Sequence, residues 1–287
     1  MTTAQAAPKT RPKALVLRGP GTNCEDETLR ALRMGGAEAD LLRADVVAKD
    51  PSQLEGYAVL VFAGGFSYGD DLAAGRVWGS SLRSAPQSGS GPGSEGLGAA
   101  LRAHVGRGGR ILGVCNGFQV LVESGLFEPE ASPEERSIAL FANASNHYEC
   151  RWVTLEVQES RCDWLTAGDR MPTPVAHGEG RFAVRDDAAL EQLRSQGQIV
   201  LTYVDEKGEP GAPAGYPANP NGAAGDVAGI CDPTGRVVGL MPHPERNLDP
   251  WNHPQWTRLQ GPGSKRSEGE GLAFYRALVE SALTQSL

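Results

Sequence analysis

The sequence has no run of about 18 consecutive apolar residues, the shortest stretch expected of a membrane-spanning helix. Its first dozen residues also lack the apolar stretch of a secretory signal. Basic residues are too few to balance the acidic ones, since 27 Lys and Arg face 35 Asp and Glu and leave the 287 residues with a net charge of −8. We therefore expect a cytoplasmic protein that binds no membrane and, through its overall field, no nucleic acid.

Cysteines are few and show no pairing pattern. The chain contains five, an odd number: Cys24, Cys115, Cys150, Cys162 and Cys231. No two have the Cys-x-x-Cys spacing and no histidine cluster accompanies them, which argues against a disulfide framework and a structural zinc site. We expect reduced thiols, with Cys150, Cys162 and Cys231 as packing residues, and assign no metal to this chain.

Glycine and proline are abundant: the 37 glycines and 20 prolines make up about a fifth of the 287 residues. The two usually contribute roughly 12% together. Residues 84–98 (SAPQSGSGPGSEGLG) predict a flexible surface insertion. Residues 249–271, which contain three prolines and two tryptophans, fit no regular element and are described as an irregular extension. Residues 1–12 predict a disordered tail, so that residues 13–287 would form one domain.

Short apolar runs alternate with helix-compatible stretches along the first half of the chain. Strands are predicted at residues 13–18, 39–42, 57–62 and 110–114, and helices at 25–34 and 116–124. Further strands are predicted at residues 151–157, 199–204, 227–231 and 237–241, the last two as a hairpin, with a closing helix at 272–283. This order predicts an α/β fold with a mainly parallel central sheet flanked by helices.

Cys115 lies between a predicted buried strand and a predicted helix, with glycines on both sides in Gly-Val-Cys-Asn-Gly. This is the cysteine form of the strand-turn-helix elbow that presents a nucleophile, and the helix N-terminus favours a thiolate there. The glycines are needed because side chains would collide with the strand and the helix. The turn also leaves the backbone N–H of Asn116 free to donate to an oxyanion. The alternatives are a buried structural cysteine and a nucleophile at Cys24, which has no flanking glycine pair.

His243 is the candidate base. It follows the predicted strand 237–241, and in an extended segment it shares a side with Glu245, two residues later. The carboxylate of Glu245 can then accept a hydrogen bond from one ring nitrogen and leave the other nitrogen for the thiol, the orienting role of a third triad member. The alternative is an ordinary loop histidine beside prolines.

A cysteine elbow followed much later by His-Pro-Glu resembles the class I glutamine amidotransferases, whose fold is flavodoxin-like. Within that family the chain is similar to the glutaminase subunits of phosphoribosylformylglycinamidine synthase, an enzyme of purine biosynthesis, over nearly its whole length. The motifs that carry the resemblance are GTNCE at 21–25, GGFSYGDD at 64–71, CNGFQ at 115–119, HGEGR at 177–181, NPNG at 219–222 and MPHPER at 241–246.

The resemblance implies a role for each matching residue. Cys115 would attack the carboxamide of glutamine, His243 would relay protons and Glu245 would hold His243, so that the chain hydrolyses glutamine to glutamate and ammonia. The remaining residues are expected to form the oxyanion and substrate site: Gly64, Gly65, Phe66, Asn116, Gln119 and His177. Gln119 shares a helix face with Cys115 at i+4. His177 and Glu179 would line the glutamine site or a partner interface, or else belong to an ordinary polar loop.

The same resemblance implies partners. A large synthetase subunit, often with a small third subunit, would use the ammonia in the ATP-dependent conversion of formylglycinamide ribonucleotide to formylglycinamidine ribonucleotide. ATP and magnesium are expected on that subunit and no cofactor on this chain, which has no Walker A pattern. The alternatives are a cysteine protease or redox sensor of the same superfamily, a non-enzymatic regulatory subunit, and a dinucleotide-binding enzyme, for which no G-x-G-x-x-G follows a strand.

Overall fold

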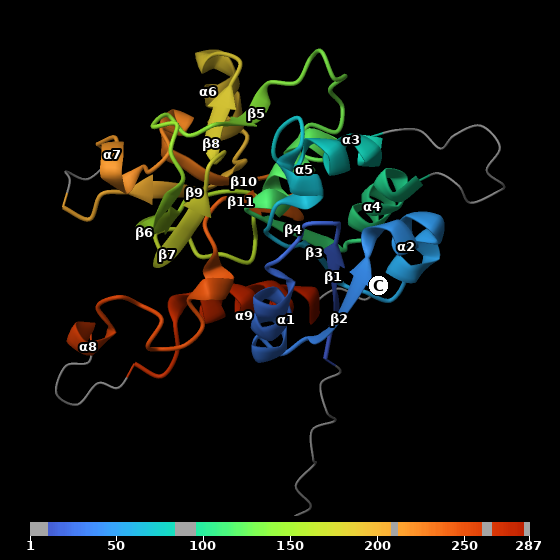
Figure 1. The fold of residues 1–287 in the computed structure, drawn as a ribbon, viewed down its shortest axis with the longest axis horizontal. Helices are drawn as coiled ribbons and strands as arrows, with labels where there is room; N and C mark the ends of the chain where they lie inside the picture. The colour runs from blue at the N-terminus through green and yellow to red at the C-terminus, as the bar shows by residue number, and fades with distance from the viewer. Residues whose placement is uncertain (1–10, 84–95, 208–211, 260–265, 284–287) are drawn as a thin grey trace, which may run out of the picture.

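The computed structural model describes residues 11–83, 96–207, 212–259 and 266–283 (Figure 1). Its strands are β1 (Lys13–Arg18), β2 (Glu38–Arg43), β3 (Val59–Phe62), β4 (Arg110–Val114), β5 (Ile138–Phe141), β6 (Glu149–Val157), β7 (Arg170–His177), β8 (Arg181–Val184), β9 (Ile199–Val204), β10 (Val227–Cys231) and β11 (Val237–Leu240). Its helices are α1 (Glu25–Met34), α2 (Ala44–Lys49), α3 (Arg76–Arg83), α4 (Gly96–Gly106), α5 (Asn116–Ser124), α6 (Asp187–Ser195), α7 (Gly215–Ala218), α8 (Trp256–Leu259) and α9 (Glu270–Leu283).

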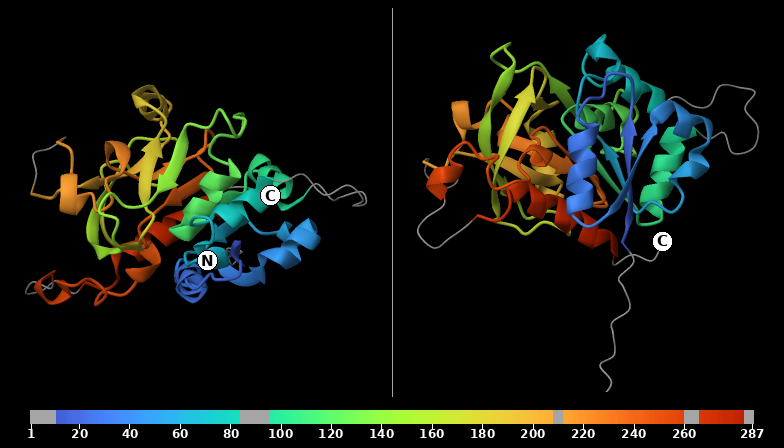
Figure 2. Two further views of the ribbon diagram at one scale, coloured as in Figure 1. Left: turned by 45° about the horizontal axis from the view of Figure 1, so that its top comes forward. Right: turned by 60° about the horizontal axis from the view of Figure 1, so that its bottom comes forward.

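The described residues form a nine-stranded sheet in the order β2-β1-β3-β4-β11-β10-β9-β6-β7. Neighbours from β2 to β11 run parallel, and those from β11 to β7 run antiparallel. Helix α1 contacts β1 and β2 and packs against α9, which also contacts β7, whereas α3, α4 and α5 lie on the other side of the sheet (Figures 1 and 2). The expected α/β fold is therefore confirmed, with an antiparallel extension on one side of the parallel strands.

The parallel strands at the centre are apolar because helices cover both of their faces. Every residue of β3, β4 and β11 is buried. A strand of this kind shows a continuous apolar run in the sequence and not an alternation. An apolar run of this kind predicts β4 with its observed bounds. The bounds predicted for the strands β1, β9 and β10 and for the helices α1 and α5 also match the structure. The hairpin of β10 and β11 is also confirmed.

The least expected strand is β7, because Pro172 and Pro174 interrupt its sequence. Proline cannot donate to a neighbouring strand and is therefore confined to sheet edges. Strand β7 is such an edge, since it pairs with β6 on one side only. The ring nitrogens of the two prolines lie on the unpaired side, so no ladder hydrogen bond is lost. The carbonyl oxygens on that side accept hydrogen bonds from His243 N and Asn247 Nδ2.

The segments singled out by composition are only partly covered. Residues 1–10, 84–95 and 260–265 lie outside the described residues, so the predicted tail, insertion and extension are seen only at their ends. The predicted end of the insertion at residue 98 is wrong, because residues 96–98 form the first turn of α4, with Leu97 and Gly98 buried. The predicted tail ends at Pro12, whose carbonyl oxygen already accepts a hydrogen bond from Glu38 N at 3.0 Å. The extension contains α8 and the start of α9.

Within the described residues, none of the helices combines the length and the apolar character needed to cross a bilayer.

Candidate active site

Cys115 occupies a strained turn between β4 and α5. Its backbone has φ 52° and ψ −109°, a left-handed conformation that residues with a side chain rarely adopt. The two flanking glycines are required for the steric reason that the sequence suggested, because a side chain at either position would collide with neighbouring backbone. A Cβ on Gly117 would lie 1.9 Å from the carbonyl oxygen of Phe62 in β3, and one on Gly113 would lie 2.8 Å from the backbone of Gly117. The turn therefore has the geometry of a nucleophile elbow.

The sheet places His243 next to this elbow. Strands β4 and β11 are parallel neighbours, with Val114 paired to Leu240, so the residues that follow each strand emerge at the same edge. The backbone N–H of Cys115 donates to the carbonyl oxygen of Leu240 at 2.8 Å, which holds the two chain segments together. Gly64 completes the contact, because a Cβ there would lie 3.0 Å from His243 Cε1 and 3.5 Å from Cys115 Cβ.

His243 and Glu245 form a buried pair, with 2.6 Å between Nδ1 and Oε1 and side chains 1% and 0% exposed. The other ring nitrogen, Nε2, is buried and has no hydrogen-bond partner within the described residues. Burial lowers the pKa of His243, but Glu245 and then Cys115 outweigh this and hold that pKa well above its usual value. Nδ1 is thus held by a carboxylate that favours the protonated ring, and Nε2 is left for the cysteine.

The unpaired edge of β7 fixes this arrangement from a third side. The carbonyl oxygen of Pro174 accepts a hydrogen bond from the backbone N–H of His243 at 2.8 Å, and that of Pro172 accepts one from Asn247 Nδ2 at 2.8 Å. The next carbonyl on the same edge, that of Ala176, lies 3.8 Å from Cys115 Sγ. At Pro172 and Pro174 this edge therefore offers acceptors only, and these bind the histidine turn.

His177 is buried beside this pair and does not lie in a loop. Asn143 donates from Nδ2 to the carbonyl oxygens of His147 and His177, so its Oδ1 is the acceptor for His177 Nδ1 at 3.1 Å. This leaves His177 Nε2 unprotonated, buried and without a partner among the described residues. Burial, and then His243, lower the pKa of His177 to about 3, so the ring is neutral. Its contact with glutamine stays a prediction.

The side chains of Asn116 and Gln119 form a network at the start of α5. Asn116 Oδ1 accepts from Ser67 N at 3.0 Å, and its Nδ2 donates to Gln119 Oε1 at 3.0 Å. Gln119 Nε2 donates in turn to the carbonyl oxygen of Glu179. Both ends of the Gln119 amide are therefore engaged, and the residue holds the 177–181 segment in place. The predicted contact of Gln119 with glutamine remains open.

Two backbone N–H groups can meet near Cys115. Asn116 is the first residue of α5, and the first N–H groups of a helix have no partner within it. In the 64–66 loop the N–H of Phe66 is already used, because it donates to the carbonyl oxygen of Gly21 at 2.9 Å. The prediction that residues Gly64 to Phe66 supply an oxyanion donor is thereby narrowed to the N–H groups of Gly64 and Gly65.

Cys24 lies close to the histidine pair but in a different environment. Its Sγ accepts from Arg246 at 3.1 Å and donates to Asn23 Oδ1 at 3.3 Å. Burial, and then Glu245, raise the pKa of this thiol far above neutral pH. Cys24 therefore keeps its proton, which favours Cys115 over its rival as the nucleophile.

Among the described residues, one group of side chains meets the spacing of a metal site. Ligand atoms of Cys24, His243 and Glu245 lie within 4.8 Å of one another. However, the guanidinium of Arg246 already contacts the thiol, and His243 Nδ1 is already bound to Glu245. We therefore assign Glu245 to the support of His243 and Cys24 to the contact with Arg246, and assign no metal ion to this group.

The remaining cysteines differ from the sequence expectation at one position. Cys162 and Cys231 are buried packing residues as expected, but Cys150 is exposed. Cys150 lies in β6, whose side chains alternate between the two faces of the sheet, and it falls on an open face. The prediction that Cys150 packs inside the protein is therefore wrong.

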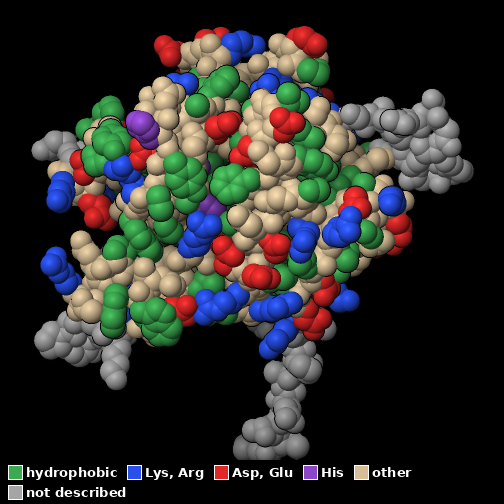
Figure 3. Space-filling view, viewed as in Figure 1, with side chains coloured by type: hydrophobic (Ala, Val, Ile, Leu, Met, Phe, Trp, Pro, Cys, Tyr) green, Lys and Arg blue, Asp and Glu red, His purple; other side chains and the backbone are tan. Residues whose placement is uncertain are grey.

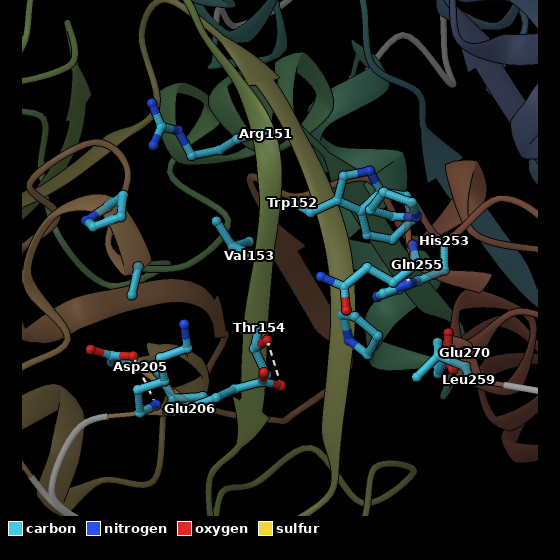
Figure 4. Close-up of a pocket in the computed structure, with 16 residues that line it drawn as sticks. Arg151, Trp152, Val153, Thr154, Asp205, Glu206, His253, Gln255, Leu259 and Glu270 are labelled. Carbon is cyan, nitrogen blue, oxygen red and sulfur yellow. Dashed lines mark hydrogen bonds between the residues drawn. The ribbon is translucent and has the colours of Figure 1, made fainter. Parts of the chain in front are cut away.

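A separate hollow of about 750 Å³ lies along β6, away from the candidate residues. Figure 4 shows Trp152 on one side of this strand, next to His253, and Arg151 and Val153 on the other. Thr154 donates to Glu206 across the hollow at 3.0 Å. None of its lining residues belongs to the predicted site, so the hollow and the candidate active site are different places.

Sequence reasoning missed two supporting residues. Asn143, which organises His177, lies in no motif and gave no signal. Asn221 belongs to the NPNG motif, for which the sequence suggested no role. Its Nδ2 donates to the carbonyl oxygen of Gly180 at 2.8 Å, which fixes the end of the HGEGR segment.

The sequence also matches a known family. Residues 11–280 match the model of the CobB/CobQ-like glutamine amidotransferase domain. This chain belongs to that family. The expected resemblance to glutamine amidotransferases is thereby confirmed. The roles of Cys115, His243 and Glu245 as nucleophile, base and support of the base stay predictions.

Two relatives and two solved structures give further detail. Phosphoribosylformylglycinamidine synthase subunit PurQ of Methanococcus maripaludis is 42% identical over 249 residues, covering 86% of this chain and 87% of the relative. The PurQ subunit of Dehalococcoides mccartyi is 38% identical over 271 residues, covering 94% and 97%. The PurLQS structure from Thermotoga maritima matches with a TM-score of 0.63 and 28% identity over 94% of this chain and 98% of the other. The glutaminase domain of Trypanosoma brucei CTPS, at 13% identity, TM-score 0.53 and coverage of 96% and 95%, shows the fold alone.

Proposed function

We propose that this chain is the glutaminase subunit of a phosphoribosylformylglycinamidine synthase. It hydrolyses glutamine to glutamate and ammonia and supplies the ammonia to a synthetase subunit in purine biosynthesis. The relatives with high coverage carry that subunit's name, and the family is one of glutamine amidotransferases. The observation that carries the proposal is the strained Cys115 elbow beside the buried His243–Glu245 pair.

The proposed chemistry proceeds in two steps. The Cys115 sulfur attacks the carboxamide carbon, and the C–N bond breaks as His243 gives a proton to the departing ammonia. Water then attacks the resulting γ-glutamyl thioester, His243 takes up a proton from it, and glutamate leaves with the thiol restored. Glu245 keeps the imidazole in place through both steps and favours its protonated form.

The oxyanion formed in each step needs preorganised donors. Asn116 N–H at the start of α5 is one, and the 64–66 loop provides the other. Removal of a single such donor in other enzymes costs roughly 3–4 kcal/mol of transition-state stabilisation. The contact between the elbow and the loop at Gly64 supports this pairing of donors, because a Cβ on Gly64 would lie 3.5 Å from Cys115 Cβ.

We further propose a large synthetase subunit as partner, with a small third subunit, and with ATP and magnesium bound on the synthetase. The exposed aromatic residues near Cys115 support a protein contact on this side. Phe66 ends the 64–66 loop, Tyr68 lies just after it, and both are exposed. Tyr148 is exposed as well, and burial and then Cys115 raise the pKa of its hydroxyl. Figure 3 shows acidic and basic side chains interspersed on the face it draws, without the basic patch that nucleic acid would require.

The test reconstitutes the chain with its synthetase partner and follows formylglycinamidine ribonucleotide with two nitrogen sources. Cys115→Ala should remove product formation from glutamine and leave formation from added ammonium unchanged, because the thiol acts only on glutamine. A complex that assembles normally but also fails with ammonium would contradict this division of labour. Wild-type protein that neither hydrolyses glutamine nor supports the synthetase would overturn the proposed function itself.

A further inference from the structure

The GTNCE motif at 21–25 has no role in the chemistry above, yet it lies against the 64–66 loop. The two segments form an antiparallel bridge between Thr22 and Gly65. Within it, the carbonyl oxygen of Gly64 accepts hydrogen bonds from Asn23 N at 3.3 Å and Cys24 N at 3.2 Å. Phe66 N donates back to the carbonyl oxygen of Gly21 at 2.9 Å.

This bonding pattern fixes the direction of one N–H group. In an extended segment the polar backbone groups of successive residues point to opposite edges. The carbonyl of Gly64 and the N–H of Phe66 both face the 19–24 loop. In a trans peptide the C=O of Gly64 and the N–H of Gly65 point in opposite directions, so the N–H of Gly65 faces away from the 19–24 loop.

The contacts between the two loops leave no room for movement toward each other. A Cβ on Gly21 would lie 2.1 Å from the carbonyl oxygen of Phe66, and one on Gly65 would lie 2.7 Å from Asn23 N. A further hydrogen bond, from Tyr68 N to the carbonyl oxygen of Pro20 at 2.7 Å, continues the contact beyond the bridge. The 19–24 loop also has an internal hydrogen bond, in which Thr22 Oγ1 accepts from Gly19 N at 3.1 Å.

We propose that the 19–24 loop is the positioning element for the second oxyanion donor, the backbone N–H of Gly65, and that Gly21 sets the distance between the two loops. The inference rests on the proposed glutaminase function and deepens it. The side chains of the 19–24 loop take no part in proton transfer. The loop acts by holding a peptide in the orientation that the tetrahedral intermediate needs, and preorganisation of this kind lowers the barrier of the chemical step without changing the affinity for the substrate.

The test is Gly21→Ala with Gly56→Ala as the matched control, both measured in the complex with the synthetase subunit. The two glycines have nearly the same backbone, with φ 86° and φ 80°, so an alanine is equally strained at either position. A Cβ at Gly56 meets nothing within 4 Å, however, whereas one at Gly21 pushes against the 64–66 loop. The difference between the variants therefore isolates displacement of the loop from backbone strain.

We expect Gly21→Ala to lower kcat by about 10²–10³-fold, the usual loss of one oxyanion donor, with KM changed by less than about threefold. Glutamate γ-semialdehyde probes the same site, because the Cys115 sulfur adds to its carbonyl carbon and the oxygen becomes the oxyanion of a thiohemiacetal. Its affinity should fall by a similar factor. Alkylation of Cys115 by iodoacetamide forms no oxyanion and should be unchanged, and Gly56→Ala should match wild type in all three measurements.

Three results would overturn the inference while leaving the proposed function intact. These are a folded Gly21→Ala with wild-type kcat, a loss of kcat without a loss of aldehyde affinity, and an equal loss in Gly56→Ala. A second variant covers the case in which Gly21→Ala does not fold. Thr22→Val keeps the shape of the side chain, removes the acceptor for Gly19 N–H and should lower kcat and aldehyde affinity together by a few-fold. Wild-type values for both would equally count against the proposal.

Discussion

Two strand-to-helix junctions in this protein each carry a buried cysteine at the start of a helix, and they differ in almost every other respect. Cys115 follows β4 directly, with φ 52° and ψ −109°. Cys24 stands six residues after the end of β1, with φ −103° and ψ 16°. Neither side chain caps its helix. A helix N-terminus alone therefore does not distinguish a nucleophile from a supporting thiol.

The difference lies in what surrounds each thiol. Cys115 adjoins His243, whose Nε2 has no other partner among the described residues. Cys24 is held between Arg246 and Asn23, and its pKa is raised by burial. The strained turn places Cys115 where β4 and β11 end side by side, whereas Cys24, after a longer loop, is bonded to Arg246 and Asn23.

The contrast between the two cysteines requires that Cys115 reacts only with His243 beside it. We expect His243→Ala to lower glutamine hydrolysis by a factor on the order of 10³–10⁴, as in other triads, because no group remains to move the proton. Glu245→Gln should cost less, since Gln still packs beside the ring but no longer favours its protonated form. Steady-state rates of both variants in the assembled complex provide the measurement.

His253→Ala is the control for the base, because this histidine lines the separate hollow at β6. It should leave the rate unchanged. A His243→Ala enzyme as active as wild type would contradict the assignment of the base, and a Glu245→Gln enzyme slower than His243→Ala would contradict the supporting role of the carboxylate.

A smaller effect, on the free energy of unfolding, is expected from a side chain added at the tight elbow and not from one added at an open position. Gly117→Ala should lower the free energy of unfolding by about 3 kcal/mol, because its Cβ meets the backbone of Phe62 at 1.9 Å and neither β3 nor α5 can move aside. Gly106→Ala, at the end of α4 and with nothing within 4 Å, should be neutral or stabilise by up to about 1 kcal/mol. Denaturant unfolding of both variants tests this, and equal stabilities would show that the elbow tolerates a side chain.

The same contrast separates what the sequence could reveal from what it could not. The elbow was predictable because strand, cysteine and glycines are adjacent in the chain and the steric need for each glycine is local. The pairing of His243 with Glu245 was predictable for the same reason, from a spacing of two residues. The central apolar strands were equally legible, since burial on both faces leaves a continuous apolar run.

The parts that escaped prediction depend on contacts between distant segments. Strand β7 was missed because Pro172 and Pro174 usually exclude a strand, and only an unpaired sheet edge permits them. The hydrogen bond that orients the His177 ring is made with Asn143, 34 residues earlier. The environment of the Cys24 thiol depends on Arg246, 222 residues away. Residues 96–98 were placed in a loop because their composition continues that of the preceding stretch, whereas packing against α3 makes them helical.

The identity of the reacting cysteine is the central claim, and covalent labelling tests it most directly. The assembled complex is incubated with a glutamine-like electrophile, 6-diazo-5-oxo-norleucine, and the modified residue is located by intact mass and peptide mapping. We predict one adduct on Cys115 of the wild-type chain, no adduct in Cys115→Ala, and an adduct still on Cys115 in Cys24→Ala. An adduct on Cys24, or labelling that persists in Cys115→Ala, would contradict the account.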